Sequence, residues 1–306
     1  MLVSIRKVKR RAFWIGLICL SFISCTIEPI EITDTNLDRR MAVHCLFSTN
    51  ERMHFSLTRS TVNIDGETGS TDHLTGATAR LYADGVLVGT FSEEPIEEVG
   101  SDSVYRIDYF PQEGVIYRIE VDHQNYPSIY GESLIPPSVD NIVSIDYSVV
   151  HVLPGENGDL NITVQLRVVD NSEINYSEIL LTNSSLSLGV FKSSSLQPNY
   201  LVTPLDFRKQ NSHFFNDDFF RDTYIDISLR DIIVGYNVDL ENYDDLLIIS
   251  KNITKEHFDY RRTTRLQSQN YKDPFAEPVT IISNIQGGHG IFAGFNQTIY
   301  YLDIEN

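Results

Sequence analysis

The sequence predicts a mainly β protein, with an N-terminal immunoglobulin-like β-sandwich followed by a larger antiparallel β-rich domain that contains one helix in its C-terminal half. Apolar and polar residues alternate along 115–122, 160–168 and 225–230, which is the period-2 pattern of strands with one face in solvent. Residues 77–91 place Asp84-Gly85 between two strand-like runs, a strong signal of a two-residue hairpin. Such elements recur at the spacing expected of antiparallel sandwiches.

Two further elements are predicted in the C-terminal half. Leu246–Ile249 is a short continuous apolar run, which favours a strand buried on both faces. Residues 254–269 predict a helix, because Thr254 is a suitable N-cap and Glu256 lies near the positive end of the helix dipole. The apolar residues of this segment do not share one helical face, so periodicity supports the helix only weakly.

Pro136-Pro137 marks the predicted domain boundary, because two consecutive prolines remove two backbone donors and end the preceding strand. The prediction divides the chain into four parts. They are a signal peptide at residues 1–24, a tether at 25–40, the sandwich domain at 41–137 and the β-rich domain at 138–306.

The N-terminus has the layout of a bacterial lipoprotein signal. A basic run, Arg6–Arg11, precedes an apolar stretch, Ala12–Ile23, that is too short for a comfortable membrane span. Phe22-Ile23-Ser24-Cys25 then resembles a lipobox, in which a small residue precedes the cysteine that receives lipid. The alternative is an ordinary secretory peptide, or an uncleaved anchor, with an incidental cysteine.

Lipidation would make Cys25 the first mature residue and attach the chain to a membrane through its acyl chains, palmitate among them. Several chains on one cysteine hold firmly, since each buried methylene contributes about 0.8 kcal/mol. Cys19 leaves with the signal, so Cys45 is the only other cysteine of the mature chain and no intrachain disulfide can form. Cys45 lies in an apolar run and is expected to be a buried strand residue.

Charge and motif content exclude several classes of function. The full chain has 24 Lys+Arg and 42 Asp+Glu, and loss of the five bases of residues 1–24 leaves 19 bases and a net charge of −23. A field of that sign repels phosphate and argues against nucleic-acid binding. No zinc-protease, nucleophile-elbow, P-loop or paired-cysteine motif is present. We therefore expect neither an enzyme nor a resident cofactor, although sequence does not exclude a glycosidase-like carboxylate pair about 5–10 Å apart.

Two weak candidate sites stand out. Asp239, Glu241 and Asp244 supply hard oxygen ligands for calcium, but the run lacks the glycine and terminal glutamate of an EF-hand loop. The aromatic-acidic segment 214–224 suits either an exposed recognition loop or a strand-turn-strand with its rings in the core, and the second is favoured. Its candidate binding residues are Phe214, Phe215, Phe219 and Tyr224.

The C-terminal region carries a recognisable signature. Residues 274–279 read Pro-Phe-Ala-Glu-Pro-Val, followed by Ser283-Asn284-Ile285 and by a Gly-rich turn that runs into Gly290-Ile291-Phe292-Ala293-Gly294. This resembles the C-terminal signature of a Bacteroidota outer-membrane lipoprotein family, the domain-of-unknown-function family 4249. Residues 215–224 resemble a second stretch of that family, and the resemblance spans nearly the whole mature chain.

The resemblance implies a lipid-anchored outer-membrane protein that assists a TonB-dependent receptor in nutrient capture or uptake, with no catalytic residues to carry over. Acids at Glu28, Glu31 and Asp34 resemble the export signals of surface lipoproteins, so the protein is expected to face the cell exterior. The alternative function is a surface structural protein or adhesin with the immunoglobulin-like domain as a spacer.

The signature also has a structural interpretation. Its Gly-rich turn, 287–290, supplies positive φ angles, and Ile291, Phe292 and Phe295 offer apolar side chains to a core. Ser283-Asn284 can bond to the nearby backbone. We expect the segment to close the fold, with a partner contact as the less favoured role.

Overall fold

The computed structural model describes residues 39–60, 73–95, 103–138, 142–151, 160–169, 176–183, 192–196, 203–207, 210–216, 224–234, 246–270, 275–277 and 279–302. The predicted signal peptide and nearly all of the predicted tether lie outside these residues. The described chain is mainly β, as predicted, and contains the helix α2 (Lys255–Asn270). The strands form three sheets.

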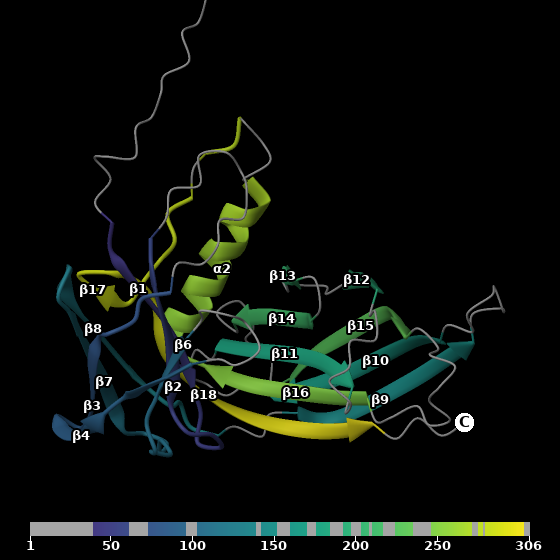
Figure 1. The fold of residues 1–306 in the computed structure, drawn as a ribbon. Helices are drawn as coiled ribbons and strands as arrows, with labels where there is room; N and C mark the ends of the chain where they lie inside the picture. The colour runs from purple at the N-terminus through teal and green to yellow at the C-terminus, as the bar shows by residue number, and fades with distance from the viewer. Residues whose placement is uncertain are drawn as a thin grey trace, which may run out of the picture. The chain divides into compact units, whose positions relative to one another are not determined.

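The largest sheet combines strands from both ends of the chain (Figure 1). In spatial order it contains β13 (Thr203–Phe207), β14 (Gln210–Asn216), β11 (Tyr176–Asn183), β16 (Leu246–Ile253), β18 (His289–Leu302), β1 (Met41–Phe47), β2 (His54–Arg59), β6 (Ser103–Arg106) and β5 (Ser92–Pro95). The pairing is antiparallel except between β18 and β1, which run parallel from Ala42↔His289 to Phe47↔Gly294. Antiparallel pairing therefore predominates in this sheet, as the sequence predicts, and β18–β1 is its parallel pair.

Apart from β17, the strands of each smaller sheet come from one side of Pro136-Pro137. One contains β17 (Ile285–Gln286), β8 (Tyr126–Leu134), β7 (Ile116–His123), β3 (Thr78–Ala83) and β4 (Val86–Thr90), in that order. The other contains β12 (Lys192–Leu196), β15 (Tyr224–Val234), β10 (Leu160–Val169) and β9 (Ile142–His151). Only β17, a two-residue strand, brings the C-terminal signature into the first of these.

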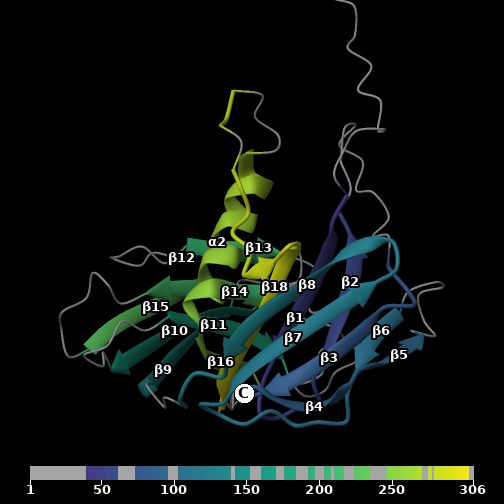
Figure 2. The ribbon, with the colours of Figure 1, turned by 90° about the vertical axis from the view of Figure 1, so that its left-hand side faces the viewer.

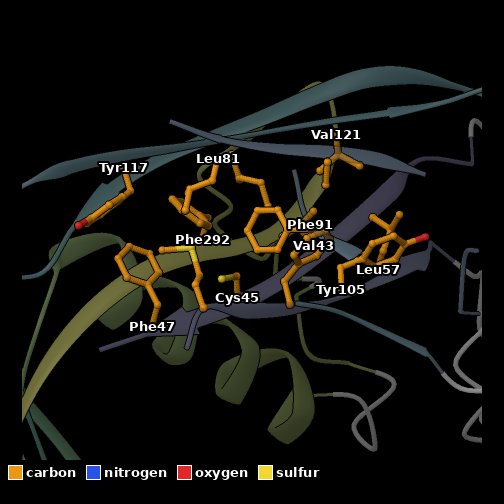
Figure 3. Packing of buried hydrophobic residues seen from close by; sticks show 14 of the residues in the cluster. Val43, Cys45, Phe47, Leu57, Leu81, Phe91, Tyr105, Tyr117, Val121 and Phe292 are labelled. Carbon is orange, nitrogen blue, oxygen red and sulfur yellow. The ribbon is translucent and has the colours of Figure 1, made fainter. Parts of the chain in front are cut away.

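An apolar core lies between the five-stranded sheet and the β1–β2–β18 part of the large sheet (Figures 2 and 3). Figure 3 shows Leu81, Tyr117 and Val121 on one side, pointing toward side chains of β1 and β2 on the other. Phe292 of β18 lies in the same cluster and packs on Phe47 with ring centroids 4.8 Å apart. β18 therefore supplies part of this core, which lies between two sheets and is here called the sandwich core.

The Pro136-Pro137 segment is tied to strands of the C-terminal half. The Asn296 Nδ2 group donates to the Pro136 carbonyl at 3.4 Å, and the Asn252 Nδ2 group donates to the Pro137 carbonyl at 2.9 Å. Strands from both sides of the predicted boundary thus share a sheet, a core and these bonds. The immunoglobulin-like assignment and the division at residue 137 stay predictions.

Local predictions from the sequence can be compared with the strands. The Asp84-Gly85 hairpin is confirmed, with positive φ angles of 46° and 78° between β3 and β4. The predicted helix is also confirmed, and the Thr254 hydroxyl accepts the His257 amide at 3.4 Å as an N-cap. The prediction that Leu246–Ile249 is buried on both faces is wrong, because Ile248 is buried while Leu247 and Ile249 are only partly covered.

Candidate functional site

The residues singled out from the sequence fall mostly outside the described chain. Cys25, Phe219 and the calcium candidates Asp239, Glu241 and Asp244 lie there. Phe215 is on β14 and Tyr224 begins β15, and nothing is described of either side chain.

Phe214 is the one aromatic candidate whose side chain is described. Its ring is 5% exposed and belongs to a small apolar cluster with Ile253 and Phe295. This burial agrees with the core interpretation of the segment. Within the described parts of the chain, no group of three or more His, Cys, Asp or Glu side chains is placed to hold a metal ion.

The C-terminal signature closes the fold through glycines that backbone atoms approach directly. Gly290 has a φ of 101°, and a Cβ there would lie 1.9 Å from the Val43 carbonyl oxygen. A Cβ on Gly294 would lie 2.2 Å from the Leu134 carbonyl oxygen. No larger residue fits at either position, so β18 lies against β1 and β8 only because these positions are glycine.

Asn284 fastens the same segment with its side-chain amide. The amide nitrogen donates to the Phe292 carbonyl at 2.7 Å and to the Glu132 carbonyl at 3.2 Å, and its oxygen accepts the Phe292 amide at 3.0 Å. One side chain thereby joins the approach to β17, the strand β18 and the end of β8. The structural interpretation of Ser283-Asn284 agrees with these bonds.

A second region of interest lies where α2 contacts the large sheet. Glu178 of β11 is 4% exposed, although a buried carboxylate is costly unless it is paired. Lys251 of β16 approaches it with Nζ at 3.6 Å, and Arg261 of α2 approaches it with Nη2 at 3.6 Å. Two cations, one from the sheet and one from the helix, therefore share this carboxylate.

Aromatic rings line the same contact. The Arg261 guanidinium lies over the Phe214 ring at 4.9 Å, and the Lys251 ammonium lies over the Phe295 ring at 4.8 Å. Phe258 of α2 packs against Tyr176 with ring centroids 5.2 Å apart. The contact thus combines charged groups with aromatic faces that attract cations.

His257 is the most buried residue of α2 and lies inside this contact. Its side chain is 2% exposed, and neither ring nitrogen has a hydrogen-bond partner among the described residues. Burial lowers the pKa of His257 well below its ordinary value, and the charges of Arg261 and Lys251 lower it further. The imidazole is therefore neutral at pH 7, held between an aromatic ring, Phe214, and two permanent cations.

The outward face of the five-stranded sheet exposes both apolar and charged side chains. Arg118 lies over the Tyr130 ring at 4.1 Å and forms ion pairs with Glu120 at 2.9 Å and Glu132 at 3.1 Å. Toward one end, Leu87, Ile116 and Leu134 are 54%, 53% and 36% exposed. Ile116 and Leu134 are register partners, and these three side chains are here called the apolar edge.

Sequence reasoning missed both the buried charges and the apolar edge. Glu178 directly precedes the apolar run Ile179–Leu181 of β11, and a charge at the start of an apolar run is a signal present in the sequence. No comparable signal in the sequence pointed to His257. The buried face of a helix is normally recognised by its apolar residues, and α2 buries polar ones. In the described residues, no helix has the length and apolar character needed to cross a membrane.

Together these features define a mainly β protein in which the C-terminal signature completes a core built mostly from residues 41–135. The chain belongs to the family described as Domain of unknown function (DUF4249), whose sequence profile matches residues 27–300. No curated protein matches the chain.

Proposed function

We propose that this protein is a lipid-anchored, non-catalytic accessory protein of a bacterial outer membrane, of the Bacteroidota type. It faces the cell exterior and assists a TonB-dependent receptor in nutrient capture or uptake. The observation that carries the proposal is the N-terminal sequence from Arg6 to Cys25, which has the layout of a lipoprotein signal. Membership of the family and the acidic residues after Cys25 support the same location.

The apolar edge is the surface that we assign to the receptor contact. Exposed apolar side chains gathered on one face of a sheet can mark an interaction site, and two of the three, Ile116 and Leu134, are direct cross-strand partners. Leu87, Ile116 and Leu134 project from strands held by the apolar core, so the surface is already formed before any partner binds. The neighbouring charges of Arg118 and Glu132 would form a polar rim around it.

The proposal is tested by purifying the tagged, natively lipidated protein from detergent-solubilised outer membrane and identifying what comes with it by mass spectrometry. A TonB-dependent receptor in near-stoichiometric amount is the expected result. A Leu87→Glu, Ile116→Glu double variant should lose the receptor, whereas Glu132→Gln on the same face should keep it. Recovery of the protein alone, or with unrelated membrane proteins, would contradict the accessory role and favour the adhesin.

The anchor and its orientation have separate tests. Incorporation of a palmitate analogue should occur in the natural chain and disappear in Cys25→Ser. Added protease should degrade the protein on intact cells if it faces outward. Full resistance on intact cells, with cleavage after the membrane is broken, would place the protein on the inner face.

A further inference from the structure

The contact between α2 and the large sheet is unusual because the helix residues that it buries are polar. The two residues of α2 that are buried are His257 and Thr263, both polar, while its Leu266 is 40% exposed. Thr263 uses its hydroxyl to donate to the Asp259 carbonyl and to accept the Ile282 amide at 3.0 Å. A helix normally docks through an apolar stripe, so this helix is held by a smaller hydrophobic contribution than its length suggests.

The connectivity makes α2 separable from the sheet that it covers. The helix connects β16 to the segment before β18, and these two strands pair directly with each other from Leu246↔Leu302 to Ile253↔Phe295. At its far end the chain is fastened again by Asn284. Release of α2 would therefore leave the sheet intact and uncover Phe214 and Phe295.

From this arrangement we infer that α2 is a proton-controlled flap: protonation of His257 releases the helix from the large sheet and exposes the aromatic patch beneath it. The charged or titratable groups that act on His257 are Arg261 from α2, Lys251 from β16 and His44 from β1, and Glu178 from β11 pairs with the first two. Phe214 of β14 contributes a ring but no charge. A proton on the imidazole would place a third cation beside Lys251 and Arg261, and neither N–H would have an acceptor among the described residues.

The direction of the effect follows from linkage. The pKa of His257 is lower in the closed state than in the open state, so the open state binds the proton more tightly. Stability of the closed flap is fully present above the ordinary histidine pKa of about 6.5 and falls as the pH decreases below it. The opening equilibrium constant should increase about tenfold per pH unit until the lowered pKa of the closed state is reached.

The test is amide hydrogen exchange of the mature chain between pH 7.5 and 5.0, corrected for intrinsic exchange and read by mass spectrometry. Peptides from α2 should lose protection by more than tenfold over this range, while peptides from β16, β18 and β7 keep theirs. His257→Phe retains the ring contact with Phe214 but has no titratable group, and it should abolish the pH dependence. His54→Gln, which changes a histidine on β2, should preserve it.

Each of the remaining outcomes overturns the inference. Equal protection of α2 at pH 7.5 and 5.0 would show that the helix does not respond to protons. Loss of protection in α2 and β7 together would show global acid unfolding. A pH dependence that survives in His257→Phe but disappears in Glu178→Gln would assign the effect to the carboxylate. If His257→Phe does not fold, as judged by β7 protection at pH 7.5, His257→Gln takes its place.

Discussion

The sandwich core and the α2 contact differ in how they treat buried polar groups. In the sandwich, the Tyr105 hydroxyl donates to the Leu74 carbonyl at 3.0 Å, and the Tyr117 hydroxyl accepts the Gln112 amide at 2.7 Å. Under α2, Glu178 is approached by two cations at 3.6 Å, and the ring nitrogens of His257 have no hydrogen-bond partner among the described residues. Buried polar groups without good partners destabilise, so the first region fixes the fold and the second remains adjustable.

The same strands contribute to both regions, so the difference lies in what covers each face. Val43 and Phe47 of β1 point into the sandwich core, whereas Leu46 packs in the cluster beneath α2. On β18, Phe292 lies in the sandwich core and Phe295 lies under the helix. An apolar sheet covers one face, and a mostly polar helix covers the other.

The largest effect should come from the closest backbone approach in the sandwich. Gly290→Ala would place a Cβ against the Val43 carbonyl and should destabilise by about 4 kcal/mol or more, or prevent folding. Gly114→Ala is the control, because Gly114 has a similar positive φ of 75° but open space around it. That control should cost only about 1 kcal/mol in urea unfolding. Equal losses of unfolding free energy in the two variants would show that the close Val43 carbonyl oxygen does not determine the cost at Gly290.

The next largest effect should come from Asn284. Asn284→Ala removes three hydrogen bonds that join β18 to its neighbours and should destabilise by about 2–3 kcal/mol in urea unfolding. Asn284→Asp keeps an acceptor for the Phe292 amide but loses both donated bonds. It should be destabilised to a lesser extent at low pH, where the carboxyl can donate, than at pH 7. An unchanged midpoint for Asn284→Ala would contradict the fastening role.

A smaller effect is expected from the charged contact. Glu178→Gln leaves Lys251 and Arg261 without their carboxylate and should weaken the closed flap by about 1–3 kcal/mol, a range reduced by the partial exposure of both cations. Protection of α2 amides reports this loss directly. A Glu178→Leu, Lys251→Met, Arg261→Leu triple variant should instead hold the helix as well as the natural chain. Weaker protection in that variant would show that the charges stabilise the contact.

The smallest effect is local to the start of α2. Thr254→Ala removes the hydroxyl that accepts the His257 amide and should cost about 1 kcal/mol of helix stability. Thr254→Ser should behave like the natural chain. Because the cap belongs to α2, amide exchange should rise in the first turn of the helix and remain unchanged in the sandwich. Faster exchange in β7 would contradict the separation of the two regions.

The sequence predicted those elements whose signal is local. The alternation at 160–168 corresponds to β10, the Asp84-Gly85 turn joins β3 and β4, and Thr254 caps α2. Cys45 was expected to be buried, and it is 0% exposed on β1, where burial raises the pKa of its thiol. Each of these depends on residues close together in the chain.

Features that depend on contacts between distant parts of the chain could not be predicted from such local patterns. β18 is buried along both faces at Ile291–Asn296, and its parallel pairing with β1 joins distant parts of the chain. Periodicity identifies a strand but carries no information on its partner. The contact beneath α2 was missed for a related reason, since His257 and Glu178 acquire their importance only when distant elements bury them.

The central claim is that the C-terminal signature completes the N-terminal sandwich, so that residues 39–138 lack part of their own core. The most direct measurement is urea unfolding of that segment, expressed alone, beside the full mature chain. The structure predicts no cooperative transition for the segment, because it lacks Phe292 and Ile285 and leaves the β1 edge unpaired. A cooperative transition like that of the full chain would show that the sandwich is an independent domain and would contradict the claim.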